Sequence, residues 1–184
     1  HLDGSSAGLL FPLPENARSI TVNGTSAKSS LSGGTRNVPL EDYITAGSGT
    51  LTLRYTLEDT ITEDKAGNLT LTVPLLSGFS LPVEALAFSI TLPDTPDEKP
   101  QFTSTYFQEN TDLVLNCQIS GKTITGSVKE RLQDKETLTM TLKTSKEMFP
   151  NALARRWSLD TVDLVMLSLA VLARCAHGAC AKRR

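Results

Sequence analysis

Residues 51–75 read Leu-Thr-Leu-Arg-Tyr-Thr-Leu-Glu-Asp-Thr-Ile-Thr-Glu-Asp-Lys-Ala-Gly-Asn-Leu-Thr-Leu-Thr-Val-Pro-Leu, and this stretch carries the clearest strand pattern of the chain. Apolar side chains of one parity alternate with polar ones on both sides of the turn-like segment 63–68. They are Leu51, Leu53, Tyr55, Leu57, Ile61, Leu69, Leu71, Val73 and Leu75. Because strand side chains alternate between faces, the pattern predicts a long antiparallel hairpin whose apolar positions face one core.

The same alternation recurs through the rest of the body. It marks strands at 18–22, 86–92, 102–107, 113–119, 124–128 and 138–142, and Asn23-Gly24 suits a type I′ turn. The Ser- and Gly-rich segment 29–36 is expected to be a loop. No helical period competes before residue 150. The sequence therefore predicts an all-β, two-layer antiparallel β-sandwich of immunoglobulin-like architecture.

The segment after residue 150 differs in kind, so we divide the chain into a sandwich domain, 1–150, and a linker with a hydrophobic helix, 151–184. Residues 164–173 would be apolar on every side of a helix, and such a helix is buried in protein or in lipid. Ten residues are too few to span a bilayer, which needs about 20. Extending the segment to 158–181 includes Arg174 and His177. A membrane segment, a helix packed on protein or on a second copy, and a disordered tail all stay open.

Charge separates the two parts of the chain. The formal net charge is −2, but residues 1–150 carry 12 basic and 18 acidic side chains, whereas residues 151–184 carry 6 and 2. An acidic body disfavours a nucleic-acid partner. A basic end beside an apolar run, with Trp157 before it, is typical of a membrane segment. We therefore expect the chain at the cell membrane, with the sandwich outside the cytoplasm.

Few residues suit catalysis or metal binding. The only histidines are His1 and His177, so the body lacks the usual base of a Ser-His-Asp site. We therefore expect no enzyme activity, no catalytic residues and no cofactor. Glu58, Asp59, Glu63 and Asp64 could serve as paired carboxylates or hold calcium, with Glu63 and Asp64 as the candidate ligands, although a solvated turn is the simpler interpretation. Cys175, His177 and Cys180 offer three zinc ligands where a structural site needs four.

Three further residues invite interpretation. Cys117 lies within an apolar strand and is expected to be a small buried side chain. Asn23-Gly-Thr25 and Asn68-Leu-Thr70 match the glycosylation pattern, and both lie at predicted turns. The third cysteine makes the count odd, so no closed disulfide framework follows.

The middle of the chain resembles a known family. The stretches 49–57 and 69–93, then Ile124-Thr-Gly126, 136–142 and Phe149-Pro150, are similar to the extracytoplasmic region of YciQ-like bacterial predicted membrane proteins. The resemblance covers residues 10–170 and implies a domain outside the membrane followed by a membrane helix. The family has no assigned activity, so no site residues are carried over. Residues 174–184 depart from the uniformly apolar helix of the family.

Two function classes follow. The first is a non-catalytic extracytoplasmic interaction or structural domain of a membrane-tethered bacterial protein, with a protein or cell-wall partner. The second is a carbohydrate-binding or calcium-dependent adhesive module that uses the acidic turn near residue 63. Sugar platforms need exposed aromatic rings, and aromatic residues make up only 5% of the chain, which favours the first class.

Overall fold

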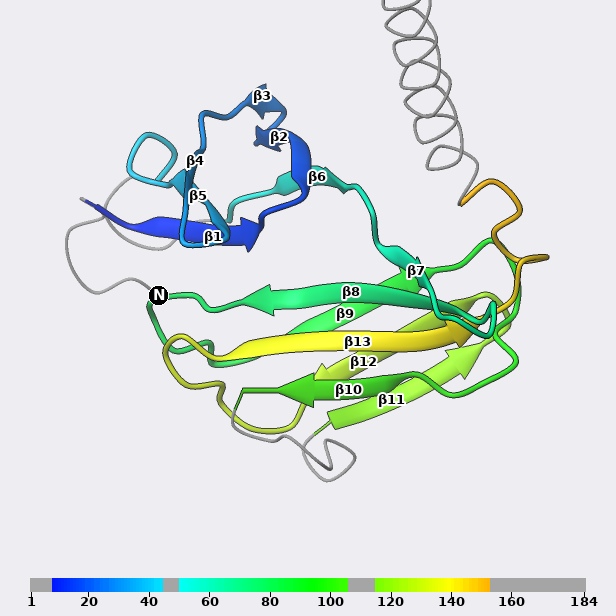
Figure 1. Ribbon diagram of the computed structural model, residues 1–184. Coiled ribbons are helices and arrows are strands. Elements are labelled where there is room, and N and C mark those ends of the chain that lie inside the picture. The colour runs from blue at the N-terminus through cyan, green and yellow to red at the C-terminus, as the bar shows by residue number, and fades with distance from the viewer. Residues whose placement is uncertain (1–7, 45–49, 106–114, 153–184) are drawn as a thin grey trace, which may run out of the picture. The chain divides into compact units, whose positions relative to one another are not determined.

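The described part of the chain is built from antiparallel strands. A computed structural model describes residues 8–44, 50–105 and 115–152 (Figure 1). Its regular elements are all strands, and every pairing between them is antiparallel, so the all-β prediction is confirmed for these residues.

Thirteen strands are present in the described residues. They are β1 (Leu10–Pro14), β2 (Ala17–Val22), β3 (Thr25–Ser26), β4 (Ser30–Ser32), β5 (Thr35–Pro39), β6 (Leu53–Leu57), β7 (Ile61–Glu63), β8 (Leu69–Ser77), β9 (Ala87–Thr91), β10 (Gln101–Ser104), β11 (Leu115–Ser120), β12 (Thr123–Val128) and β13 (Thr137–Thr144).

These strands form four sheets, which define two regions of the molecule. The amino-terminal region, β1 to β6, contains the sheets β1-β5-β4 and β3-β2-β6. The carboxy-terminal region, β7 to β13, contains the sheets β10-β13-β8-β7 and β11-β12-β9. The rings of Phe11 and Phe79, one in each region, have centroids 5.5 Å apart, so the two regions touch at this point.

The amino-terminal region has a core of its own. Its buried members are Leu13, Ala17, Ile20, Val22, Val38 and Leu40. In β2 the buried positions are 17, 20 and 22. The spacing from 17 to 20 is odd because β2 has one residue more than β6 between Arg18 and Thr21, where Ser19 has a φ of 51°. Asn23 and Gly24 have φ values of 50° and 82° and join β2 to β3, which confirms the tight turn.

One predicted loop is a hairpin instead. Residues 29–36 include β4 and the start of β5, joined by Gly33 and Gly34, with φ values of 57° and 75°. Two adjacent glycines reach these positive φ angles without a Cβ clash, so they close a two-residue turn. The loop prediction for 29–36 is therefore wrong, because the glycines that suggested a loop form the turn of a hairpin.

The carboxy-terminal region is built around two long strands. In β13 the residues Leu138, Met140 and Leu142 are buried and alternate with half-buried threonines, as predicted. This strand pairs with β8 over eight residue pairs. The strands predicted at 113–119 and 124–128 correspond to β11 and β12. They form a hairpin that pairs from Leu115↔Val128 to Ser120↔Thr123 around Gly121.

A glycine and an aromatic ring fit together on the sheet β11-β12-β9. Gly126 on β12 lies opposite Phe88 on β9, and a Cβ built on Gly126 would come 2.3 Å from the ring. The Phe88 ring centroid is also 5.5 Å from that of Phe102 on β10. Phe88 therefore covers the gap left by Gly126 and joins the two sheets of the carboxy-terminal region.

The predicted long hairpin at 51–75 is wrong. β6 pairs with β2 and its Leu53 and Leu57 pack against the amino-terminal core, whereas Leu69 and Leu71 lie on β8 in another sheet. Tyr55 is 37% exposed. The chain leaves β6 at Asp59, which has a φ of 51°, and only the short β7 forms a hairpin with β8. The shared parity therefore serves two cores.

The chain divides into two units, residues 1–145 and 146–184. In the second unit, the described residues 146–152 include a backbone hydrogen bond from Ala152 N to Phe149 O. The predicted helix at 158–173 and the membrane segment 158–181 lie outside the described residues, and the division at residue 150 stays a prediction. Within the described residues, no helix is long and apolar enough to cross a membrane.

Candidate interaction surface

The acidic turn between β7 and β8 is stabilised by hydrogen bonds to the carboxylate of Asp64. Asp64 accepts hydrogen bonds from Ala66 N (2.8 Å), Asn68 N (2.9 Å) and Asn68 Nδ2 (2.9 Å). These donors favour the charged form, and they lower the pKa of Asp64, with the Asn68 side chain as the largest cause. Glu63 ends β7 opposite Leu69. Asp64 is therefore a turn-forming residue, as in an Asx-turn.

The structure brings no metal ligands together in the part of the chain that it describes, where no group of three or more His, Cys, Asp or Glu side chains converges. The candidate ligands Cys175, His177 and Cys180 lie outside that part. Cys117 is exposed, contrary to its predicted burial. It lies on β11, an outer strand, and lines an open surface hollow with Asn116, Gln118, Thr125, Gly126 and Ser127.

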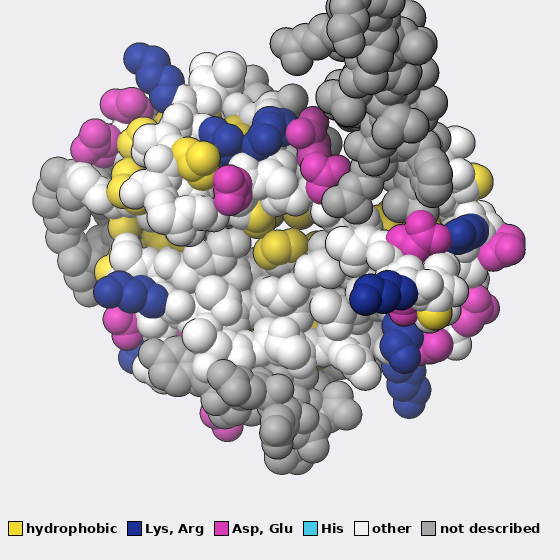
Figure 2. Space-filling view, in the orientation of Figure 1, with side chains coloured by type: hydrophobic (Ala, Val, Ile, Leu, Met, Phe, Trp, Pro, Cys, Tyr) yellow, Lys and Arg dark blue, Asp and Glu magenta, His cyan; other side chains and the backbone are white. Residues whose placement is uncertain are grey.

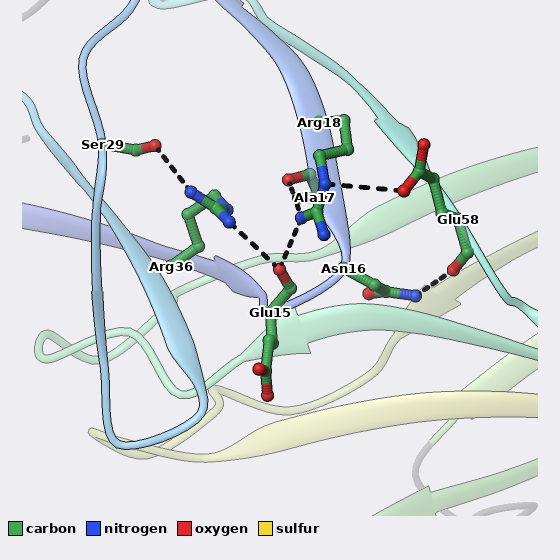
Figure 3. A network of polar contacts seen from close by, with 7 residues as sticks. All are labelled: Glu15, Asn16, Ala17, Arg18, Ser29, Arg36 and Glu58. Atoms are coloured by element: carbon green, nitrogen blue, oxygen red, sulfur yellow. Dashed lines mark hydrogen bonds and ion pairs between the residues drawn. The ribbon is translucent and has the colours of Figure 1, made fainter. Parts of the chain in front are cut away.

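Two asparagines at the ends of β2 hold β6 in place. At one end, Asn23 N donates to Thr52 O (2.8 Å) and Thr52 N donates to Asn23 Oδ1 (2.9 Å). At the other end, Glu58 N donates to Asn16 O (3.2 Å) and Asn16 Nδ2 donates to Glu58 O (Figure 3). β6 is therefore fixed by side-chain hydrogen bonds just before its first residue and just after its last.

Two arginines strengthen the Asn16 end of this arrangement. Arg18 Nη1 donates to Glu15 O (2.9 Å), and Arg18 Nε lies 3.5 Å from Glu58 Oε2 (Figure 3). Arg36, from β5, reaches the same Glu15 carbonyl at 3.5 Å and Ser29 Oγ at 3.3 Å. The carbonyl of one turn residue thus receives guanidinium groups from both sheets of the amino-terminal region.

The centre of β6 is open on both of its faces. Arg54, Tyr55 and Thr56 are exposed, while Leu53 and Leu57 are half-buried. Because consecutive residues of a strand point to opposite faces, both faces are exposed at the centre of β6. Partial burial raises the pKa of the Tyr55 phenol. In Figure 2, basic and acidic side chains lie beside one another in the upper part of the view. Strand β6 is thus an outer strand that is hydrogen-bonded at both ends and exposed at its centre.

One buried carboxylate has a structural role elsewhere. Glu136 is 1% exposed, its Oε1 accepts from Ser104 Oγ (2.6 Å) and its Oε2 accepts from Gln133 N (2.8 Å). Both carboxylate oxygens are thereby hydrogen-bonded within the carboxy-terminal region, as a buried polar group requires.

The sequence predicts the turn at Asn23 but not the hydrogen bonds by which Asn23 and Asn16 hold β6. The Oδ1 of Asn23 bonds a residue 29 positions away, and no local pattern encodes that partner. Asn16 follows Pro14-Glu15, a turn-like signal that could have marked the β1–β2 connection. Of the two asparagines in glycosylation patterns, Asn68 has its Nδ2 bonded to Asp64.

Comparison with protein-family models, with curated proteins and with solved structures finds no significant match to this chain.

Proposed function

We propose that this chain is a non-catalytic interaction or structural domain that lies outside the cytoplasm and is tethered to a membrane by its carboxy-terminal segment. The observation that carries the interaction role is β6, an outer strand fixed at both ends and exposed on both faces at its centre. Edge strands with unpaired backbone groups are a common surface for binding an extended partner. The acidic body and the apolar segment 164–173 support the location.

The finer architecture belongs to the same proposal. We take the two sheets of the carboxy-terminal region as the layers of an immunoglobulin-like sandwich, the architecture that the alternating strand pattern predicts. The contact between Phe88 on β9 and Phe102 on β10 supports this arrangement, because it joins one sheet to the other. Layers of a sandwich pack through side chains of their inner faces in this way.

Membrane fractionation tests the tether. The full chain is compared with a chain that ends at Pro150, after expression behind the same secretion signal. We expect the full chain in the membrane pellet, resistant to washing with 1 M salt (about a 3 Å Debye length), and the shorter chain in the supernatant. Equal distribution of the two chains would contradict the tether. A full chain released by salt would indicate an electrostatic attachment through the basic end, which also contradicts it.

A further inference from the structure

The outward edge of β6 has a fixed set of free backbone groups. Thr52 and Glu58 bond toward β2, through Asn23 and Asn16. Since the backbone groups of a strand point alternately to its two sides, those of Leu53, Tyr55 and Leu57 point away from the sheet. β6 is the last strand of its sheet, β3-β2-β6, so this edge has no partner strand among the described residues.

We propose that this edge pairs with the same edge of a second copy of the chain, antiparallel, with Thr56 opposite Thr56. In this register Arg54 of each copy lies opposite Glu58 of the other, and Tyr55 lies opposite Leu57. The inference rests on the proposed function in one respect, since a membrane tether concentrates copies at one surface and so favours a small interface.

Charge selects this register over its neighbours. Moving the two-fold axis to Tyr55 places Arg54 opposite Thr56, and moving it to Arg54 places the two arginines opposite each other. Only the proposed register makes two opposite-charge pairs across the interface. Both pairs are at non-hydrogen-bonded positions, where Cα atoms are about 4.5 Å apart and side chains lie closest.

The side chains are available for this contact. Arg54 is exposed and has no ion-pair partner among the described residues. The Glu58 side chain is 44% exposed beside Arg18, so it can accept a second arginine. Tyr55 lies on the face that carries Leu53 and Leu57, and in the pair it would cover the half-buried Leu57 of the other copy. Because β6 has only five residues, the contact falls below the size of stable interfaces and forms a weak, reversible pair.

Charge exchange between two full-length variants tests the pairing. Arg54→Glu leaves two acidic residues on the edge, and Glu58→Arg leaves two basic ones. We expect each variant to self-associate about tenfold more weakly than the unmodified chain, because two attractive pairs become repulsive. An equimolar mixture should recover association, since each acidic edge then meets a basic one. Sedimentation velocity in mild detergent and energy transfer between differently labelled variants measure these outcomes.

Controls separate this pairing from other effects. Arg131→Glu and Glu84→Arg make the same charge changes at an exposed ion pair in the other region and should leave association unchanged. Tyr55→Lys keeps the ion pair between Arg18 and Glu58 intact but places a charge on the edge, so it should also weaken association. A mixture that fails to recover, or variants that associate like the unmodified chain, would overturn the pairing. Membrane fractionation of the full chain does not depend on whether β6 pairs with a second copy, so the proposed tether is tested separately.

Discussion

The amino-terminal and carboxy-terminal regions are both antiparallel, but they hold their strands by different means. In the carboxy-terminal region, β8 and β13 share eight residue pairs, and buried Leu138, Met140 and Leu142 follow one another along the ladder. In the amino-terminal region, β2 and β6 share four residue pairs interrupted by a register shift. Bonds from Asn16, Asn23 and Arg18 secure the ends of that short ladder.

The difference shows how strand length sets the type of stabilisation. A long ladder buries many side chains, each worth about 1.5–3 kcal/mol, and needs little help at its ends. A short ladder has few hydrogen bonds, and each side-chain bond to backbone adds about 1 kcal/mol. The amino-terminal region can therefore keep an exposed strand, β6, in a defined position without covering it.

The largest effect is expected from truncation in the two cores. Met140→Ala and Leu13→Ala remove fully buried side chains, and each should lower the free energy of unfolding by about 2–5 kcal/mol. The cores have separate members, so Leu13→Ala should lower amide protection only in strands β1 to β6. Met140→Ala should lower it only in strands β7 to β13. Hydrogen exchange measures both, and equal loss in both regions would mean that the two cores act as one.

Substitutions of Glu136 test whether the carboxy-terminal core accommodates a buried polar group only when that group is hydrogen-bonded. Glu136→Ala leaves Ser104 Oγ and Gln133 N without their acceptor, so stability should fall by about 1–3 kcal/mol. Glu136→Gln should cost less, because its amide oxygen can accept from Gln133 N while its amide nitrogen donates to Ser104 Oγ. Chemical denaturation measures both. Glu130→Ala, at an exposed position, is the control and should have little effect. Equal losses for the Ala and Gln variants at position 136 would contradict this account.

Asn23 tests the side-chain bonds of the amino-terminal region. Asn23→Gly keeps the positive φ of the turn but removes the acceptor of Thr52 N, so it should cost about 1 kcal/mol. Asn23→Ala should cost more, because alanine is also strained at a φ of 50°. Asn23→Asp keeps the acceptor and should be close to neutral. Thermal unfolding ranks the three variants, and an Asp variant no better than Gly would exclude the Thr52 bond as the cause.

The sequence predicted the strands better than their partners. Alternation at 138–142, and at Leu69 and Leu71, is local and follows directly from burial on one face, so these parts of β13 and β8 agree with the prediction. Further along β8 the parity fails, because the register with β13 shifts there and Leu76, not Leu75, is buried. The partner of residues 53–57 was not predicted correctly, because Leu53 and Leu69 share a parity although they serve different cores. What separates them is the positive φ of Asp59, a backbone feature that no apolar pattern reports.

The interaction surface was harder to predict for the same reason. The turn at Asn23-Gly24 was evident, since few other residues reach both positive φ angles. Its bond to Thr52, and that of Asn16 to Glu58, join residues 29 and 42 positions apart. Such pairs exist only once the strands are in place, so the fixed edge of β6 became visible only in the folded chain.

The smallest effect is expected at the turn between β7 and β8 in the carboxy-terminal region. There the side chain of Asp64 accepts backbone hydrogen bonds, as the side chain of Asn23 does in the amino-terminal region. Hydrogen bonds from Asn68 hold the pKa of Asp64 below its ordinary value of 3.8. The unfolded chain therefore binds the proton more readily, and Asp64 contributes stability that is fully present above pH 3.8. This contribution is lost as pH falls through the lower pKa of the folded state.

Asp64→Asn keeps an oxygen for the backbone donors but does not titrate, so its stability should fall less steeply below pH 3.8 than that of the unmodified chain. Asp97→Asn, at another exposed position, is the control. Denaturant midpoints measured at neutral pH and at steps below pH 3.8 give the two slopes for each chain. If Asp64→Asn and the unmodified chain run parallel through this range, the turn does not draw its stability from the charged carboxylate. The contrast with the amino-terminal region would then be sharper, because polar side chains would secure strand ends only where ladders are short.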